Sequence, residues 1–292
     1  MNDNQDHKYP IVDTGLGFSL YIDQMDSYGL LHGDSSYEVH EVATVKRLVK
    51  PGYRVFDIGA NMGYFSIIFS KLVGSSGEVL AFEPDGETLE LLGQNIQLNH
   101  ADNVRVYPVA LSDESSKAVL YRCPFNVAMH RLYPSVCCDD EGVAVNAIRG
   151  DALELAPPDF VKIDVEGFEL PALRGLENTL RANNALVILS EFSPLAMLEA
   201  GYHPAEFIAF FKNLGYGLRL SSGCDWNLAD WQVLETAVSV FAAENFARFH
   251  KAAAGSSKAA LLDITLKYLA EIGYKREYFE NVLLYGPEAK AD

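Results

Sequence analysis

The chain has 292 residues, of which 49% are hydrophobic and 22% are charged, a composition that excludes a disordered chain. Its 40 acidic and 23 basic side chains give a formal net charge of −17. Because polyanion binding draws on clustered Lys and Arg, which the sequence lacks, DNA and large RNA are disfavoured as partners, and a small or neutral partner is expected.

Residues 1–50 are expected to form an extension ahead of the core. Residues 1–9 are polar and acidic rather than basic and then apolar, and no apolar run has the length of a membrane span. These features predict a cytoplasmic protein with no membrane partner. The Ser35-x-x-Glu38 pattern is a capping box, which predicts a helix that continues to about Val49 and covers the start of the core.

A glycine-rich turn follows the first predicted core strand, residues 53–58, and apolar residues at helical spacing follow the turn. Gly59 and Gly63 permit positive φ angles and the close approach of a ligand. The dinucleotide fingerprint is absent because Asn61 and Tyr64 occupy its second and third glycine positions, and no P-loop Gly-Lys-Ser/Thr follows. The turn therefore predicts a ligand without a chain of phosphates.

Glu83 ends the next predicted strand, residues 78–82, about 20 residues beyond the turn, where nucleoside-binding α/β folds place an acid on the ribose hydroxyls. S-adenosylmethionine fits this pattern, with its ribose at Glu83 and its amino-acid end at the turn. Asp57 would attract the ammonium group, and Asn61 offers both a donor and an acceptor. The alternative is a purely structural turn followed by a solvated acid.

The third unit pairs a predicted helix, residues 86–98, with a strand, residues 103–110, that brings Ser112 to its carboxyl end. Ser112 would then contact an adenine, although a turn-forming Ser-Asp pair explains the same residues. Two further strands, 118–122 and 143–148, flank a loop that carries His130 and is expected to overhang the site. Reduced thiols are expected, since no C-x-x-C pair or zinc-ligand spacing surrounds the cysteines, which are Cys123, Cys137, Cys138 and Cys224.

Acidic residues follow the predicted strand 159–164 and precede a helix that continues to about residue 180. Asp164 lies at the carboxyl edge of the strand, where a partly buried carboxylate needs a ligand or a donor. We therefore rank Asp164 ahead of Glu166 as a functional residue, and Glu166 ahead of Glu169, whose charge also suits a helix N-terminus. Glu191 follows the next strand, residues 185–190.

The last part of the chain combines two predicted strands with a long helical segment. A helix at 204–214 and a strand from 215 precede an alanine-rich stretch with apolar residues at helical spacing, and residues 281–285 form the last strand. The predicted division is an extension (1–50), a core (51–223), a helical insertion (224–278) and a last strand with a tail (279–292). The insertion is expected to be a substrate cap or an interface, such as that of a homodimer.

Several ordered motifs between roughly residues 38 and 195 give the chain a resemblance to the FkbM family of S-adenosylmethionine-dependent methyltransferases. The resemblance implies a class I methyltransferase fold, which is an α/β, Rossmann-like, doubly wound and mostly parallel seven-stranded sheet. It also implies O-methylation of hydroxyl groups on sugars or natural products, with S-adenosylhomocysteine as product and Pro84 among the cofactor contacts. The motifs are residues 56–65, 81–85, 95–99, 110–113 and 161–170.

The implied chemistry is in-line displacement at the sulfonium methyl group, with a proton taken from the acceptor hydroxyl. Four residues are candidates for the general base and the sequence does not choose among them: His130, Asp164, Glu166 and Glu191. A divalent cation on Asp164 and Glu191 is an alternative that we do not favour, because no compact ligand cluster is visible in the sequence. Two other functions stay open, a non-catalytic binding module and, less favoured, a nicotinamide-dependent oxidoreductase.

Overall fold

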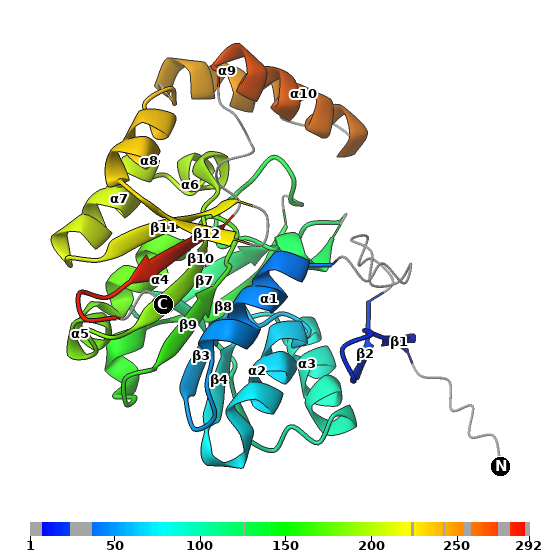
Figure 1. Cartoon of the computed structure of the whole chain (residues 1–292). Coiled ribbons are helices and arrows are strands. Elements are labelled where there is room, and N and C mark those ends of the chain that lie inside the picture. The colour runs from blue at the N-terminus through cyan, green and yellow to red at the C-terminus, as the bar shows by residue number, and fades with distance from the viewer. Residues whose placement is uncertain are drawn as a thin grey trace.

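A computed structural model describes residues 8–23, 37–124, 126–139, 141–222, 225–241, 243–253, 258–273 and 281–289. Its centre is an eight-stranded sheet with the order β12-β11-β13-β10-β9-β3-β4-β5 (Figure 1). The strands are β3 (Arg54–Ile58), β4 (Glu78–Phe82), β5 (Val104–Tyr107), β9 (Phe160–Ile163), β10 (Val187–Glu191), β11 (Gly217–Ser222), β12 (Asp225–Ala229) and β13 (Asn281–Tyr285).

The sheet is mostly parallel. Strands β5, β4, β3, β9 and β10 pair in parallel, whereas β13 lies between β10 and β11 and is antiparallel to both. Side chains alternate between two cores along each inner strand. In β3, for example, Val55 faces one core and Phe56 the other. This arrangement confirms the predicted doubly wound, Rossmann-like α/β fold.

Helices cover both faces of the sheet, as Figure 1 shows. The helices α1 (Val39–Leu48), α2 (Tyr64–Val73) and α3 (Gly86–Leu98) lie on one side, and α4 (Glu169–Gly175), α5 (Glu177–Ala182), α7 (Pro204–Asn213) and α8 (Trp231–Val238) lie on the other. Helix α6 (Pro194–Glu199) follows β10. Short 3-10 helices are η2 (Gly74–Ser76), η3 (Val127–Met129) and η4 (Gly150–Leu153).

The predicted seven strands were one too few, because residues 225–229 form β12 and extend the edge of the sheet. This stretch had been assigned to the helical insertion. It pairs with β11 as an antiparallel hairpin, from Leu218 opposite Ala229 onward. Residues 225–228 alternate polar and apolar side chains at period 2, so a short strand signal is present within the stretch predicted as helical.

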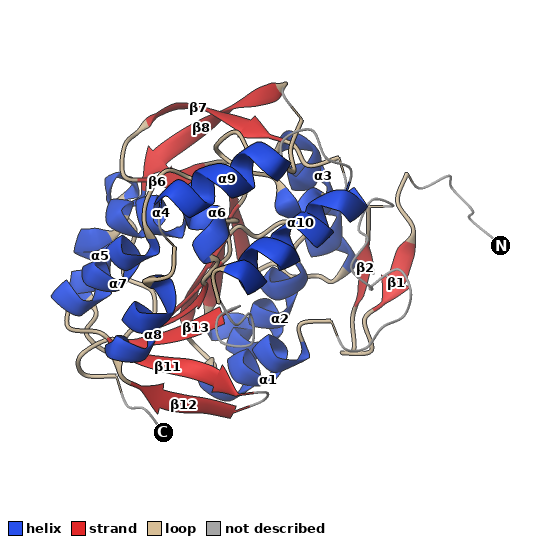
Figure 2. Cartoon of the chain, turned by 90° about the horizontal axis from the view of Figure 1, so that it is seen from above, coloured by secondary structure: helices blue, strands red, loops and turns tan. Residues whose placement is uncertain are grey.

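The predicted strand 103–110 was also wrong in extent, because it divides into β5 and β6 (Ala110–Ser112). Pro108 lies between them and has no N–H to donate to a ladder, so the chain leaves the central sheet there. Strand β6 joins β8 (Gly142–Arg149) and β7 (Ser116–Tyr121) in a second sheet of order β6-β8-β7. Figure 2 shows this small sheet along one side of the molecule.

The N-terminal segment contributes a hairpin and a covering helix. Strands β1 (Ile11–Asp13) and β2 (Ser19–Tyr21) are held to α3 by Asn95, whose amide accepts from the Tyr21 N–H at 2.7 Å and donates to the Tyr21 carbonyl at 3.0 Å. Helix α1 begins at Val39, and Glu38 precedes it with φ 50° and makes no side-chain cap bond. The predicted capping residue Ser35 lies outside the described residues.

Helices α9 (Ala243–Ala253) and α10 (Lys258–Glu271) lie over the end of the central sheet at which the parallel strands finish (Figure 1). Within the described ranges, no helix is both long enough and apolar enough to cross a bilayer.

Two glycine substitutions test the packing of the small sheet against the core. A Cβ on Gly175, the last residue of α4, would lie 1.9 Å from the Ser112 carbonyl oxygen, whereas a Cβ on Gly93 within α3 would meet nothing within 4 Å. We expect Gly175→Ala to lower the free energy of unfolding by about 1–3 kcal/mol through overpacking. Gly93→Ala should raise it by about 0.5–1 kcal/mol through helix propensity. Urea denaturation measures both, and equal effects of the two variants would contradict the described contact.

Candidate functional site

A cavity of about 630 Å³ opens at the carboxyl ends of β3, β4, β9 and β10. Ligands of open α/β sheets bind at this edge, and the volume is typical of small-molecule sites. The glycine turn after β3, the acid after β4, the turn after β9 and the β7–β8 loop all contribute to its lining.

The end of β3 and the turn after it each contribute one buried polar atom without a described partner, from residues that line the cavity. Asp57 is 1% exposed and accepts from the Ser66 hydroxyl at 2.5 Å, but its Oδ1 has no partner among the described residues. Asn61 has φ 48°, and its buried Oδ1 also lacks a described partner. Burial raises the pKa of Asp57, which the nearby ammonium of Lys162 opposes. Buried acceptors of this kind call for a donor, and the ammonium of a bound amino-acid group supplies one.

Glu83 is hydrogen-bonded to the same glycine turn. Its carboxylate accepts from the Asn61 N–H at 3.0 Å and the Asp85 N–H at 2.9 Å. Burial raises the pKa of Glu83 to about 7 despite these two bonds. The fold therefore holds the acid beside the turn, and its free lone pairs can accept from a diol.

Two of the predicted cofactor residues do not line the cavity. Gly63 lies at the N-terminus of α2 with φ 94°, and a Cβ there would lie 2.6 Å from Leu92 Cδ1. The Ser112 hydroxyl donates to Asp113 Oδ1 at 3.2 Å, and its neighbours Ala110 and Leu111 line the cavity instead. The remaining predicted residues all line it: Asp57, Gly59, Asn61, Glu83, Pro84, His130, Asp164, Glu166 and Glu191.

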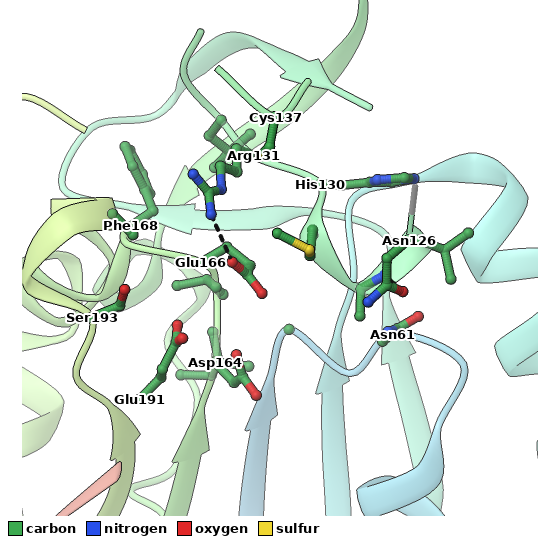
Figure 3. Close-up of a pocket in the computed structure, with 18 of the residues that line it drawn as sticks. Asn61, Asn126, His130, Arg131, Cys137, Asp164, Glu166, Phe168, Glu191 and Ser193 are labelled. Atoms are coloured by element: carbon green, nitrogen blue, oxygen red, sulfur yellow. Dashed lines mark hydrogen bonds and ion pairs between the residues drawn. The ribbon is translucent and has the colours of Figure 1, made fainter. Parts of the chain in front are cut away.

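Three of the predicted acids form a carboxylate cluster, which we define as Asp164, Glu166 and Glu191. One oxygen from each lies within 4.8 Å of the others. Asp164 and Glu166 come from the turn after β9, and Glu191 ends β10. Figure 3 shows the three side chains pointing toward one another. The fourth acid, Glu169, is fully buried. It accepts from the Val165 and Gly167 N–H groups, and these hydrogen bonds fix the backbone of the turn after β9.

Two members of the carboxylate cluster have fixed counter-charges. Lys162 donates to Asp164 Oδ2 at 3.0 Å, and Arg131 donates to Glu166 Oε2 at 3.1 Å. Glu191 has no such partner among the described residues, and its buried Oε2 accepts no hydrogen bond. Burial, followed by the charges of Glu166 and Asp164, raises the pKa of Glu191 well above its usual range.

His130 lies apart from the carboxylate cluster. Figure 3 places it with Asn126 and Asn61 on the opposite side of the cavity. Its Nδ1 accepts from the Cys123 N–H at 3.1 Å, and burial lowers the pKa of the imidazole. Neutral His130 is therefore positioned near the glycine turn rather than near the acids.

Sequence reasoning missed Arg131, the residue that anchors the β7–β8 loop. Arg131 is 8% exposed and also contacts Glu199 Oε2 at 2.6 Å, so one guanidinium joins Glu166 to helix α6. A single arginine in an irregular loop has no spacing signal, because its partners lie far away in the sequence. Cys137 also lines the cavity, and Cys123, Cys137 and Cys138 are free thiols, whereas Cys224 lies outside the described residues.

Side chains from the helical segment close the outer side of the cavity. Most of them are apolar, which gives this wall a different character from the carboxylate cluster. The contributors are Phe241, Phe249, Thr265, Leu266 and Leu269. The described part of the helical segment thus contributes to the lining of the cavity.

The raised pKa of Glu83 makes stability depend on pH. A folded-state pKa of about 7, against 4.5 for the free side chain, means that the folded state holds a proton which the unfolded state has lost. Stability of the cofactor-free protein should therefore fall as pH rises from about 5 to 7, by as much as about 3 kcal/mol for this group. Glu83→Gln should flatten the slope in urea titrations across that range. An unchanged slope would contradict the assignment.

The match to a known protein family covers the residues of the site. The family model described as the methyltransferase FkbM domain matches residues 57–218, which contain the glycine turn, Glu83 and the carboxylate cluster. The hexuronic acid methyltransferase AglP of Haloferax volcanii is 29% identical over 138 residues, covering 46% of this chain and 54% of that protein. The ribosomal protein L11 methyltransferase of Acetivibrio thermocellus is 37% identical over 87 residues, covering 29% and 27% respectively.

Among solved structures, the methyltransferase FkbM of Methylobacillus flagellatus aligns with a TM-score of 0.42 and 16% identity, over 71% of this chain and 54% of that one. The chain thus spans about half or less of the length of these relatives. The family match covers more than half of this chain, from the first core strand to β11. The chain belongs to the FkbM family of methyltransferases.

Proposed function

We propose that the protein is an S-adenosylmethionine-dependent O-methyltransferase that acts on a small or carbohydrate-like hydroxylated acceptor. The observation that carries the proposal is that one cavity has two chemically different halves. Asp57, Asn61 and Glu83 offer acceptors at the glycine turn, and the neighbouring carboxylate cluster and the apolar side chains of the helical segment line the rest of the same cavity. Membership of a methyltransferase family supports it.

The cofactor half fits the charges of S-adenosylmethionine. Asp57 Oδ1 and Asn61 Oδ1 would accept from the ammonium group, and Glu83 would accept from the ribose hydroxyls. Gly59 is needed for a separate reason: a Cβ there would lie 2.0 Å from the Asp164 carbonyl oxygen, so the turn could not approach β9 with any other residue. Cofactor and carboxylate cluster would then be neighbours.

The acceptor half suits a hydroxylated molecule with an apolar portion. Carboxylates accept from hydroxyl groups, and the side chains of Phe249 and Leu266 offer contact to the apolar faces of a sugar ring or another scaffold. The similarity to AglP, named as a hexuronic acid methyltransferase, supports a carbohydrate acceptor.

Methyl transfer would proceed by direct displacement. A lone pair of the acceptor oxygen attacks the methyl carbon while the carbon–sulfur bond breaks, and sulfur keeps that electron pair to become the neutral thioether of S-adenosylhomocysteine. The hydroxyl proton passes to the carboxylate cluster, which lies in the acceptor half, rather than to His130, which lies beside Asn61. Alignment of the two reactants would supply much of the acceleration.

Calorimetric titration with S-adenosylmethionine and S-adenosylhomocysteine tests the cofactor, with NADH as the control. We expect micromolar binding of the first two and none of NADH. Glu83→Gln and Asp57→Ala should each weaken binding at least tenfold, because each removes a partner of the ligand. Ser112→Ala is the matched control and should bind like the parent, since its hydroxyl does not line the cavity. NADH binding would instead indicate an oxidoreductase, and no binding would indicate a non-catalytic module.

A second experiment tests the acceptor half. Release of S-adenosylhomocysteine is measured with a panel of sugars, hexuronic acids and hydroxylated aromatic compounds. For any accepted compound, Asp164→Asn should lower kcat at least tenfold while the thermal midpoint changes little, because Asp164 lies at the partly exposed edge of the cavity. An Asp164→Asn enzyme as active as the parent would remove Asp164 from the mechanism.

A further inference from the structure

We propose that the carboxylate cluster, Asp164, Glu166 and Glu191, holds one divalent, oxygen-preferring cation, which in turn receives oxygen atoms of the methyl acceptor. The inference rests on the proposed function for the identity of the acceptor, whereas the cation site itself is argued from the geometry of the three acids. Local sequence patterns do not favour a metal, because these acids come from two separate strand ends.

The spacing of the three carboxylates suits a single cation. Their nearest ligand oxygens all lie within 4.8 Å of one another. Oxygens bound to Mg²⁺ or Ca²⁺ lie about 2.0–2.6 Å from the ion, so two of them are separated by no more than about 4–5 Å. Figure 3 shows the three side chains converging on one region of the cavity from the ends of β9 and β10.

The second observation is the unpaired oxygen of Glu191. Glu191 Oε2 is shielded from solvent and has no hydrogen-bond partner among the described residues. The three ligand oxygens are close enough to one another for a common ion. A buried acceptor of this kind requires a ligand.

The charges around the carboxylate cluster also favour a bound cation. Lys162 and Arg131 offset the charges of Asp164 and Glu166, at 3.0 Å and 3.1 Å, but no described cation contacts Glu191. The residual negative charge lies at the wall of the cavity, where a divalent ion would offset it. Arg131 and Lys162 also fix the positions of two ligands before the ion binds, which lowers the cost of ordering them.

The donor set defines the class of ion. All three ligands are carboxylate oxygens, which suit Mg²⁺, Ca²⁺ or Mn²⁺ rather than a thiophilic metal. Three protein ligands leave coordination positions open toward the cavity. An acceptor with two neighbouring oxygens, such as a vicinal diol or a hydroxy acid, can occupy two of them. Binding to the ion would lower the pKa of its hydroxyl, which would then lose its proton to water, whereas without the ion the carboxylate cluster itself would take the proton.

Mn²⁺ titration of the chelator-treated full-length protein, followed by electron paramagnetic resonance, tests the site. We expect one bound Mn²⁺ per chain that Mg²⁺ or Ca²⁺ displaces. Glu191→Gln and Glu166→Gln should each weaken Mn²⁺ binding at least tenfold. Glu83→Gln is the matched control, an acid of the same cavity outside the cluster, and should keep the parent's Mn²⁺ affinity.

Titration of the same variants with S-adenosylhomocysteine separates the two proposals. Glu191→Gln should bind this compound like the parent, and Glu83→Gln should bind Mn²⁺ but not this compound. Metal-free Glu191→Gln should also melt no lower than the parent, because the amide has nearly the same shape and replaces a carboxyl whose charged form burial disfavours. The melting curve of this variant therefore tests for a folding defect. Failure of Mn²⁺ to bind at millimolar concentration, or binding that Glu191→Gln and Glu166→Gln leave unchanged, would overturn the cation site and leave the cofactor proposal standing.

Discussion

The close packing of the glycine turn against the end of β9 is the constraint on which the cavity depends. Gly59 has φ 81°, and its missing Cβ leaves room for the Asp164 carbonyl oxygen, while the Asp164 N–H donates to the Ile58 carbonyl at 3.0 Å. Two strands that are consecutive neighbours in the sheet but distant in sequence thereby bring their loops into contact. The cofactor half and the carboxylate cluster are adjacent because this one contact is possible.

That arrangement buries several acidic side chains. Asp57, Glu83 and Glu191 all have pKa values raised chiefly by burial, so the ligand-free molecule holds acids in a setting that disfavours their charged forms. Lys162 offsets part of this, since it lies in register with Asp57, donates to Asp164 and packs its ammonium 4.6 Å from the Phe65 ring centroid. Buried acids with raised pKa values at the carboxyl edge of a sheet are typical of a ligand-binding site.

Local sequence patterns predicted much of the fold, because period-2 and period-3.6 hydrophobicity mark elements that bury one side. Strand 78–82, helix 86–98 and strand 281–285 have the predicted bounds. Two failures have physical reasons: Pro108 divides one predicted strand, and the short period-2 pattern of β12 is followed directly by a much longer helical pattern. The glycine turn and Glu83 were visible because their spacing is local. The convergence of Glu191 with Asp164, and the role of Arg131, depend on contacts across the sheet that no local pattern encodes.

The position of β13 has a consequence for how the cavity is assembled. Glu191 is paired in register with Asn281, which also lines the cavity, so the strand that holds one acid in place is completed only by residues from much later in the chain. Helices α6 to α10 lie between these two strands in sequence. Contacts of such long sequence separation form late in folding because of their loop-closure entropy. The helices that line the outer side of the cavity therefore precede in the chain the strand that completes the sheet beside Glu191, and we expect the cavity to be complete only after β13 has paired.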